Sequence, residues 1–255
     1  MIDCISNIAW RKDDNKEILP VLRDIGIKSI EVAPLEIFES WESVSFQQIK
    51  NFKNTCDNYS LQIVSMQSIF YKKNINIFQD YEKSVEHMKL IFSILEDLEC
   101  DYCVFGAPKS RITSLPVQES YKIFKNFLYE SPSSITIGIE SNPEQYGTNF
   151  INNYRQNTDF IETHIDRDNI KIHLDIGCHL MSKVNSDLVF EKAIKHSSNH
   201  VHYSKPMLGI IDNITKDESR LLNMVSDKTI SLEMKKTNID VLKKIITNNL
   251  NKTIN

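Results

Sequence analysis

Eight short apolar runs, each followed by a polar or amphipathic stretch, divide this chain into repeating units from end to end. We predict strands at 4–9, 27–32, 62–66, 102–105, 135–140, 170–175, 200–203 and 229–234. Apolar residues recur at helical spacing in several intervening stretches, and the clearest predicted helices are 15–25, 81–98 and 239–250. Eight strands that each precede a helix predict an α/β chain folded as a single (β/α)8 TIM barrel. The alternative is a doubly wound open sheet, which usually has fewer strands and a glycine-rich first turn.

Length and composition agree with one barrel and exclude several partners. The chain has 255 residues, and a (β/α)8 barrel needs about 250, so we expect a single domain over residues 1–255. It has 6 glycines and no glycine-rich phosphate loop, which excludes the usual nucleotide motifs. A net charge of −4 gives no support for nucleic acid or an anionic membrane as a partner.

The chain carries no sign of export or of a disulfide framework. No apolar stretch approaches the length of a transmembrane helix, and the first residues lack a basic segment followed by an apolar one. We therefore expect a cytoplasmic protein. The five cysteines are an odd number, and Cys100 and Cys103 form a lone CxxC pair. We expect buried free thiols there, with zinc binding or redox use as the alternative.

The last four predicted strands alternate apolar and polar residues, and each polar phase ends on an ionisable side chain. These four end residues are Glu140, Asp175, His202 and Glu233. Alternate residues of a strand face opposite sides, so the apolar phase should contact the outer helices and the polar phase should face the barrel interior. Most barrel interiors are filled by branched apolar residues. A polar interior on four successive strands therefore indicates function rather than stability.

The spacing of these four residues predicts a metal site. They lie roughly one βα unit apart, near the carboxyl ends of neighbouring strands, where barrel enzymes place their catalytic groups. Three converging carboxylates repel one another unless a cation joins them. One imidazole with three carboxylates suits Mn²⁺, Co²⁺, Mg²⁺ or Zn²⁺. The alternative is that each residue is an isolated polar group at the start of a loop.

Several segments of the chain resemble the xylose isomerase-like TIM barrel superfamily, which includes sugar-phosphate isomerases and epimerases, ketose 3-epimerases and an apurinic-site endonuclease. The segments that carry the resemblance are GIESNP (138–143), HLDIGCH (173–179), HVHYSKP (200–206) and SLEMK (231–235). Four more are similar to a bacterial subgroup of isomerase/epimerase-like proteins, namely SNIAW (6–10), IEVAP (30–34), SMQSIFY (65–71) and VFGAPKSR (104–111).

The resemblance implies both a cofactor and a reaction. It implies that Glu140, Asp175, His202 and Glu233 bind one divalent metal ion, Mn²⁺ before Co²⁺, Mg²⁺ or Zn²⁺, and that Glu140 and Glu233 are the catalytic acid/base pair. Such a site removes a proton next to a carbonyl and stabilises the enediolate. We therefore expect a metal-dependent isomerase or epimerase of carbohydrate metabolism. Its partner would be a small sugar or sugar phosphate, and relatives commonly form homo-oligomers.

Further residues are expected around the mouth of the barrel. Lys109 and Arg111 follow the fourth strand and are candidates to bind a phosphate or carboxylate. At two positions the chain departs from the family's motifs, which places His179 and Lys205 toward the substrate. The predicted substrate-binding residues are Gln67, Lys109, Arg111, Asn142, His179 and Lys205.

Glu31 is expected to reach the mouth or orient its neighbours. His200 is expected one layer deeper than His202, hydrogen-bonded to a ligand carboxylate.

Two other functions remain open from the sequence. An apurinic-site endonuclease with three zinc ions needs further imidazoles on the second and third strands, where this chain has Glu31 and Gln67. It would also need a more basic surface. A sugar-binding barrel without catalytic activity is the other alternative, because a fold does not determine a function.

Overall fold

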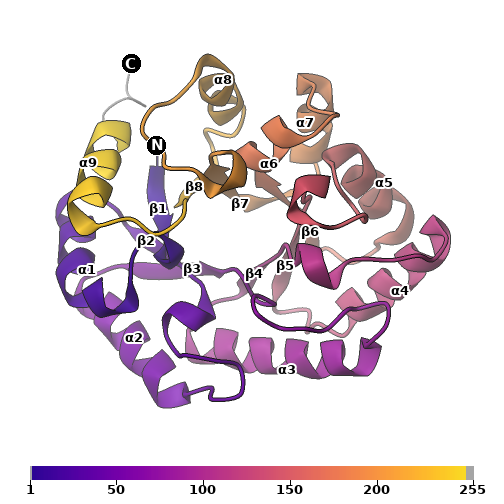
Figure 1. Ribbon diagram of the computed structural model, residues 1–255, viewed down its shortest axis with the longest axis horizontal. Helices are drawn as coiled ribbons and strands as arrows, with labels where there is room; N and C mark the ends of the chain where they lie inside the picture. Colours follow the sequence, from indigo (N-terminus) through magenta and orange to yellow (C-terminus); the bar gives the residue numbers. More distant parts are fainter. Residues whose placement is uncertain (1, 251–255) are drawn as a thin grey trace.

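The computed structural model describes residues 2–250, and its eight parallel strands hydrogen-bond in chain order until the eighth pairs with the first (Figure 1). The strands are β1 (Ile2–Ser6), β2 (Ser29–Val32), β3 (Gln62–Met66), β4 (Tyr102–Phe105), β5 (Thr136–Glu140), β6 (Ile170–Asp175), β7 (Ser197–Ser204) and β8 (Thr229–Glu233). The predicted (β/α)8 barrel is therefore confirmed. Predicted strand ends differ by a few residues, most of all at β1, which begins and ends earlier than expected.

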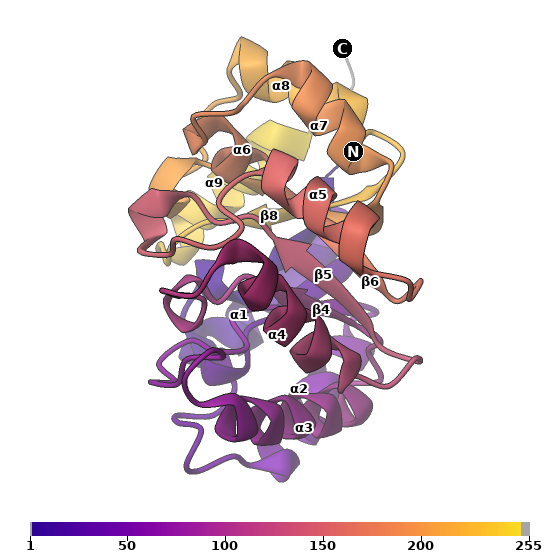
Figure 2. The same cartoon turned by 90° about the vertical axis from the view of Figure 1, so that its right-hand side faces the viewer.

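Helices surround this barrel on the outside (Figures 1 and 2). Over the described residues they are α1 (Asn15–Asp24), α2 (Phe46–Asn58), α3 (Tyr81–Asp97), α4 (Val117–Tyr129), α5 (Tyr154–His164), α6 (Ile176–Met181), α7 (Asp187–Ile194), α8 (Lys216–Met224) and α9 (Ile239–Leu250). The three helices predicted from apolar spacing correspond to α1, α3 and α9. One helix was not expected: α6 begins directly at the end of β6, before the longer α7.

The alternation of the strands sets the two sides of the barrel wall. In β5, Ile137 and Ile139 are fully buried in the apolar core, and Gly138 and Glu140 occupy the other phase. The interior below the mouth is polar: the Tyr102 hydroxyl lies 2.8 Å from both His173 Nδ1 and Ser198 Oγ. Gly138 makes room for this contact, because a Cβ atom there would overlap the Tyr102 hydroxyl. The predicted polar interior is therefore present.

Two further expectations concern the whole chain. All five cysteines are buried and free, which includes the Cys100–Cys103 pair. Among residues 2–250, no helix has both the length and the apolar character needed to cross a membrane.

Candidate metal centre

Four side chains from neighbouring strands converge at the carboxyl ends of β5 to β8. Glu140, Asp175, His202 and Glu233 each offer one ligand atom, and these atoms all lie within 4.8 Å of one another. The strand register produces this meeting, because Asp175 pairs with His202 across β6 and β7. All four residues are shielded from solvent, and even the Glu140 side chain is only 12% exposed. The structure therefore brings together the four residues that the alternation singles out.

His202 lies between the three carboxylates and a fourth one deeper in the barrel. Its Nδ1 atom is 3.4 Å from Glu140 Oε1, 3.2 Å from Glu233 Oε2 and 4.0 Å from Asp175 Oδ2. Its Nε2 atom lies 2.8 Å from Glu31 Oε2. Nδ1 is buried and has no hydrogen-bond partner. Glu31 therefore holds the Nε2 side of the ring, whereas Nδ1 faces three carboxylates and has no hydrogen-bond partner.

The protonation of the two ring nitrogens of His202 supports a cation among these residues. An ionised carboxylate such as Glu31 only accepts hydrogen bonds, so Nε2 must carry the proton that it donates to Glu31. A neutral ring then presents an Nδ1 lone pair to three carboxylates, and the raised pKa of His202 means that a second proton occupies Nδ1 when no metal ion is bound. Four electron-pair donors that point at one another repel, and a divalent ion between them removes that repulsion. The donor set fits the predicted metal.

The electrostatics of the carboxylates agree with this assignment. Burial raises the pKa of Asp175 to about 7, with further increases from Glu140 and Glu233. Burial also raises the pKa of Glu233. At His202, burial favours the neutral ring, but Glu31 and Glu233 outweigh it and raise the pKa well above its usual value. Without a cation, this cluster therefore holds protons that a bound metal ion would displace.

Neighbouring residues hold two of the carboxylates in place. The Ser204 hydroxyl lies 2.8 and 3.1 Å from the two oxygens of Asp175, and the Cys178 backbone N–H donates to Asp175 Oδ1 at 2.9 Å. Asp175 thereby also caps α6. The Asn142 amide donates to Glu140 Oε2 at 2.5 Å. Gly106 leaves space for the same oxygen, since a Cβ atom on Gly106 would lie 2.5 Å from it.

The Glu31 carboxylate is the centre of a hydrogen-bond network below the metal candidates. It is fully buried, and beside His202 it is contacted by Ser65 Oγ (2.7 Å), His200 Nε2 (2.9 Å), Gln67 Nε2 (3.0 Å) and Ser231 Oγ (3.4 Å). Burial alone would favour the neutral acid, but the charges and hydrogen bonds of His202 and His200 lower the pKa of Glu31 well below its usual value. Glu31 is thus an ionised acceptor that orients His202.

The position of His200 corrects one expectation. It was expected to hydrogen-bond a ligand carboxylate, yet its Nε2 atom contacts Glu31 and Ser65, neither of which belongs to the four-residue set. The reason is that the Glu31 carboxylate, which extends inward from β2, contacts the Nε2 atoms of both His202 and His200 through the same oxygen. His200 therefore supports the centre through Glu31 rather than directly.

Two of the six predicted substrate-binding residues are already engaged by the protein. The Gln67 amide donates to Ser6 Oγ at 2.7 Å and to Glu31. Asn142 bridges two groups: its Oδ1 accepts from Arg111 at 2.5 Å, and its Nδ2 donates to Glu140. Both side chains are buried. They are better described as parts of the network that holds Glu31 and Glu140.

Two more of the six lie apart from the four-residue set. Lys205 forms an ion pair of 2.7 Å with Glu218, the residue that completes the capping box of α8. The His179 ring packs against Phe190 and Tyr154, at centroid distances of 4.8 and 5.5 Å. The short helix α6 turns His179 away from the interior, between α5 and α7. In this structure, Lys205 thus contacts α8, and His179 packs between α5 and α7.

The two predicted cations after β4 differ in their exposure to solvent. Lys109 is exposed, whereas Arg111 is fully buried. Burial lowers the pKa of the Arg111 guanidinium to about 10, which leaves it cationic at neutral pH. Its Nη2 atom donates to the Glu140 carbonyl oxygen at 3.0 Å and to Asn142. Arg111 thus lies next to the candidate centre.

Three residues near the centre were not singled out as site residues from the sequence. His173 lies below the four, with its ring 4.1 Å from that of His202, and burial lowers its pKa well below the usual value. Its Nε2 atom has no hydrogen-bond partner. Ser204 and Gly106 support Asp175 and Glu140 as described above. The alternation along the strands could have identified His173 and Ser204, because they share the inward phase of Asp175 and His202.

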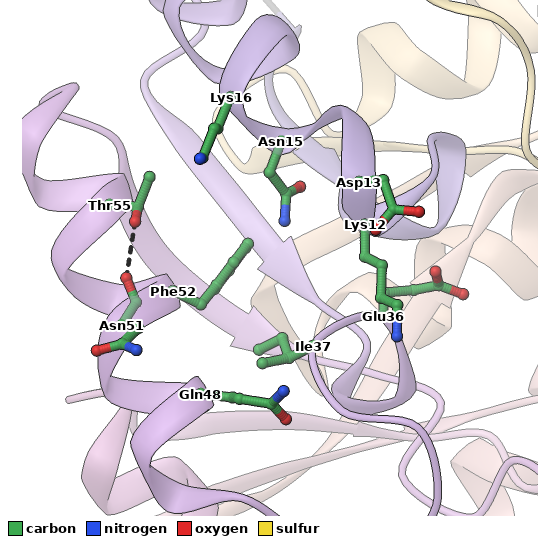
Figure 3. A pocket seen from close by; sticks show the side chains of 10 residues that line it. All are labelled: Lys12, Asp13, Asn15, Lys16, Glu36, Ile37, Gln48, Asn51, Phe52 and Thr55. Carbon is green, nitrogen blue, oxygen red and sulfur yellow. Dashed lines mark hydrogen bonds between the residues drawn. The ribbon is translucent and has the colours of Figure 1, made fainter.

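An open pocket on the flank of the barrel is separate from this centre. It has a volume of about 590 Å³ and lies beside α1 and α2, where Lys16, Phe52 and Gln48 point toward it (Figure 3). Lys12 at its edge is paired with Glu39 at 2.9 Å. None of the four candidate ligands lines it. This pocket therefore lies apart from the candidate metal ligands.

Three solved structures with which the chain compares well share its fold. D-psicose 3-epimerase from Clostridium cellulolyticum H10, solved with D-tagatose, has 12% identity over 99% of this chain and 98% of its own, with a TM-score of 0.75. AP endonuclease, family 2, from Brucella melitensis has 11% identity over 95% and 96%, with a TM-score of 0.73. The probable 3-DHS dehydratase AsbF from Bacillus anthracis has 12% identity over 100% and 99%, with a TM-score of 0.67.

Sequence comparison gives the family directly. Curated protein sequences give no significant match. The sequence profile of the xylose isomerase-like TIM barrel family, however, matches residues 19–214, which span six of the eight strands, β2 to β7. The resemblance found in the motifs is thereby confirmed, and the chain belongs to the xylose isomerase-like TIM barrel family.

Proposed function

We propose that this protein is a divalent-metal-dependent isomerase or epimerase acting on a small sugar or sugar derivative. The observation that carries the proposal is the buried, unpartnered Nδ1 atom of His202 among the carboxylates of Glu140, Asp175 and Glu233. The similarity to structures of D-psicose 3-epimerase and L-ribulose 3-epimerase supports a sugar as the class of substrate. Mn²⁺ is the proposed ion, because carboxylates dominate the donor set.

The arrangement assigns different tasks to the four residues. A bound divalent ion supplies Lewis-acid polarisation of the substrate carbonyl. Glu140 and Glu233 are the acid/base pair, since their side chains, 12% and 8% exposed, are more accessible than the 2% exposed Asp175. Asn142 occupies Glu140 Oε2 and leaves Oε1 to accept a proton. Asp175 is held by Ser204 and Cys178 and has no catalytic proton in this scheme.

The proton pathway determines the product. One of the two glutamates removes the proton from the carbon next to the carbonyl, which gives the enediolate. Return of a proton to the same carbon from the opposite face is epimerisation, and return to the neighbouring carbon is isomerisation. Glu140 and Glu233 come from strands that are not adjacent, β5 and β8, so they approach a bound substrate from different sides.

The interior of β2 and β3 favours this reaction over phosphodiester cleavage by three zinc ions. Additional zinc ions need imidazole ligands on those strands, but Glu31 and Gln67 are there and hydrogen-bond to each other at 3.0 Å. The net charge of −4 is also unfavourable for a DNA-binding surface.

Hydrogen exchange in D₂O tests the proposal without knowledge of the product. The Mn²⁺-loaded protein would be incubated with a panel of ketoses, aldoses and their phosphates, and deuterium incorporation would be measured by mass spectrometry. We expect incorporation into at least one sugar by the wild type, and none by Glu140→Gln or Glu233→Gln. Glu39→Gln is the matched control, because that side chain is 80% exposed. Exchange that survives both active-site changes, or metal binding without exchange into any sugar, would contradict the proposed reaction.

A further inference from the structure

Arg111 is a fully buried cation without a carboxylate in direct contact. Its exposed fraction is 0%. Within residues 2–250, no carboxylate oxygen lies within 4.0 Å of its guanidinium nitrogens. Arginines that are buried this completely are normally paired with an acid, because an uncompensated charge in the interior is costly. Arg111 therefore has a requirement for negative charge that the described part of the chain does not meet by direct contact.

The hydrogen bonds of Arg111 leave most of its donors unused. A guanidinium has five N–H donors. Nη2 uses its two on the Glu140 carbonyl oxygen and Asn142 Oδ1. Nε and Nη1 are buried and have no partner, which leaves three N–H donors unpaired. Buried donors are nearly always satisfied in folded proteins, so these three indicate a group that is not part of the chain.

The position of Arg111 connects this need to the candidate metal centre. Asn142 is the link: it accepts from Arg111 and donates to Oε2 of Glu140, one of the four predicted ligand residues. The guanidinium is thus one side chain away from the metal candidates. Lys109 and Lys205, the other predicted cations, do not compete for this role, because Lys109 is exposed and Lys205 is paired with Glu218.

We propose that Arg111 binds an anionic group of the substrate, so that the enzyme acts on a phosphorylated or carboxylated sugar rather than a neutral one. This inference rests on the proposed function, since it places the anion at one end of a sugar whose carbonyl lies at the metal centre. The anion accepts hydrogen bonds from Nη1 and Nε, and the guanidinium neutralises its charge. The bonds from Nη2 to Asn142 and Glu140 hold the guanidinium in place.

Sulfate is a suitable probe, because it carries the charge and oxygen geometry of a phosphate group without precipitating Mn²⁺. It would be titrated calorimetrically into metal-free and Mn²⁺-loaded protein at constant ionic strength. The variants are Arg111→Gln, which removes the charge, and Arg111→Lys, which keeps the charge but loses the fixed donors. Lys122→Gln is the matched control, because it removes one positive charge from an exposed side chain on the outer helix α4.

We expect sulfate to bind the wild type, and Arg111→Gln to weaken that binding by at least about tenfold, the usual cost of losing a charged hydrogen-bond donor. Arg111→Lys should lie in between, and Lys122→Gln should match the wild type. In the exchange assay, Arg111→Lys should lower kcat/KM for phosphorylated sugars more than for neutral ones. Circular dichroism and metal content identify any variant that has not folded, in which case Arg111→Lys decides the result alone.

The result separates this inference from the proposed function. Sulfate affinity that is undetectable in the wild type, or unchanged in both Arg111 variants, overturns the anion site, while normal metal content and exchange leave the proposed function intact. If the wild type binds no metal, the proposed function fails, and sulfate binding to the metal-free protein still decides the role of Arg111.

Discussion

Glu31 Oε2 accepts a hydrogen bond of 2.8 Å from His202 Nε2 inside the barrel, and this contact determines which ring nitrogen faces the candidate ligands. The two residues are on β2 and β7, which are separated by β8 and β1 in the closed barrel. A carboxylate behind a metal-binding histidine fixes the tautomer of the ring and makes it a better ligand. The polar interior of this barrel therefore has a direct role in the metal centre.

Replacing Glu31 with Gln should weaken metal binding without removing it. The amide retains the shape of the side chain but loses the charge, so His202 is less strongly polarised. We expect Mn²⁺ affinity to fall by about 10–100-fold, the usual effect of changing such a supporting group. Competition with a chromophoric chelator measures the change, and Glu39→Gln is the control. Equal affinity in Glu31→Gln and the wild type would show that the contact does not support the centre.

The two histidines of β7 should differ in their effects. His202→Ala removes a ligand atom and should abolish measurable metal binding. His200→Ala removes a contact to Glu31 and Ser65, so its effect should be smaller than that of Glu31→Gln. Titration of both variants with Mn²⁺ checks the order. Complete loss of metal in His200→Ala with retention in His202→Ala would reverse the assignment.

Two glycine substitutions should distinguish an effect on metal binding from an effect on folding stability. A Cβ atom on Gly106 would lie 2.5 Å from Glu140 Oε2, so Gly106→Ala should displace that carboxylate and weaken metal binding with little loss of fold. Gly26 has a φ angle of +93° and open space around it. Gly26→Ala should therefore cost about 1 kcal/mol of stability through backbone strain and leave metal affinity unchanged. Chemical denaturation and metal titration of both variants test this opposite pattern.

His179 should make the folded state sensitive to acid. Burial lowers its pKa to about 4, whereas an unfolded imidazole titrates near about 6.5. As the pH falls, the unfolded chain therefore takes up this proton first, and stability that is complete above about pH 6.5 is lost progressively toward pH 4, by about 3 kcal/mol. His179→Phe keeps the ring packing with Tyr154 and Phe190 but cannot titrate. Urea unfolding across this range should show a shallower pH dependence for the variant, and an identical slope would be evidence against a buried neutral His179.

The fold and the four converging residues could be predicted because they depend on short-range periodicity. The alternation in β5 to β8 determines which side of the wall Glu140, Asp175, His202 and Glu233 occupy. A regular βα repeat then places the ends of neighbouring strands side by side. Both properties can be read from the sequence without knowledge of any long-range contact.

The partners of individual side chains could not be predicted in the same way. His179 follows Asp175 closely, but the unexpected helix α6 rotates it between α5 and α7. The sequence places Gln67 near the mouth of the barrel but does not predict that its amide donates to Glu31 and Ser6. Such pairings join residues far apart in the chain. They depend on side-chain rotamers and loop geometry that a pattern of polar and apolar residues does not specify.

The most direct test of the central claim is the metal content of the wild type and of Asp175→Asn after equilibration with Mn²⁺ and removal of free ion. An asparagine can still accept the hydrogen bonds from Ser204 and the Cys178 backbone, so the variant should fold normally. It loses one of the three carboxylates that hold the ion. Elemental analysis should find one Mn²⁺ per wild-type chain and almost none in Asp175→Asn. A wild type without metal, or equal metal content in the two proteins, would contradict the assignment of these four residues as the metal centre.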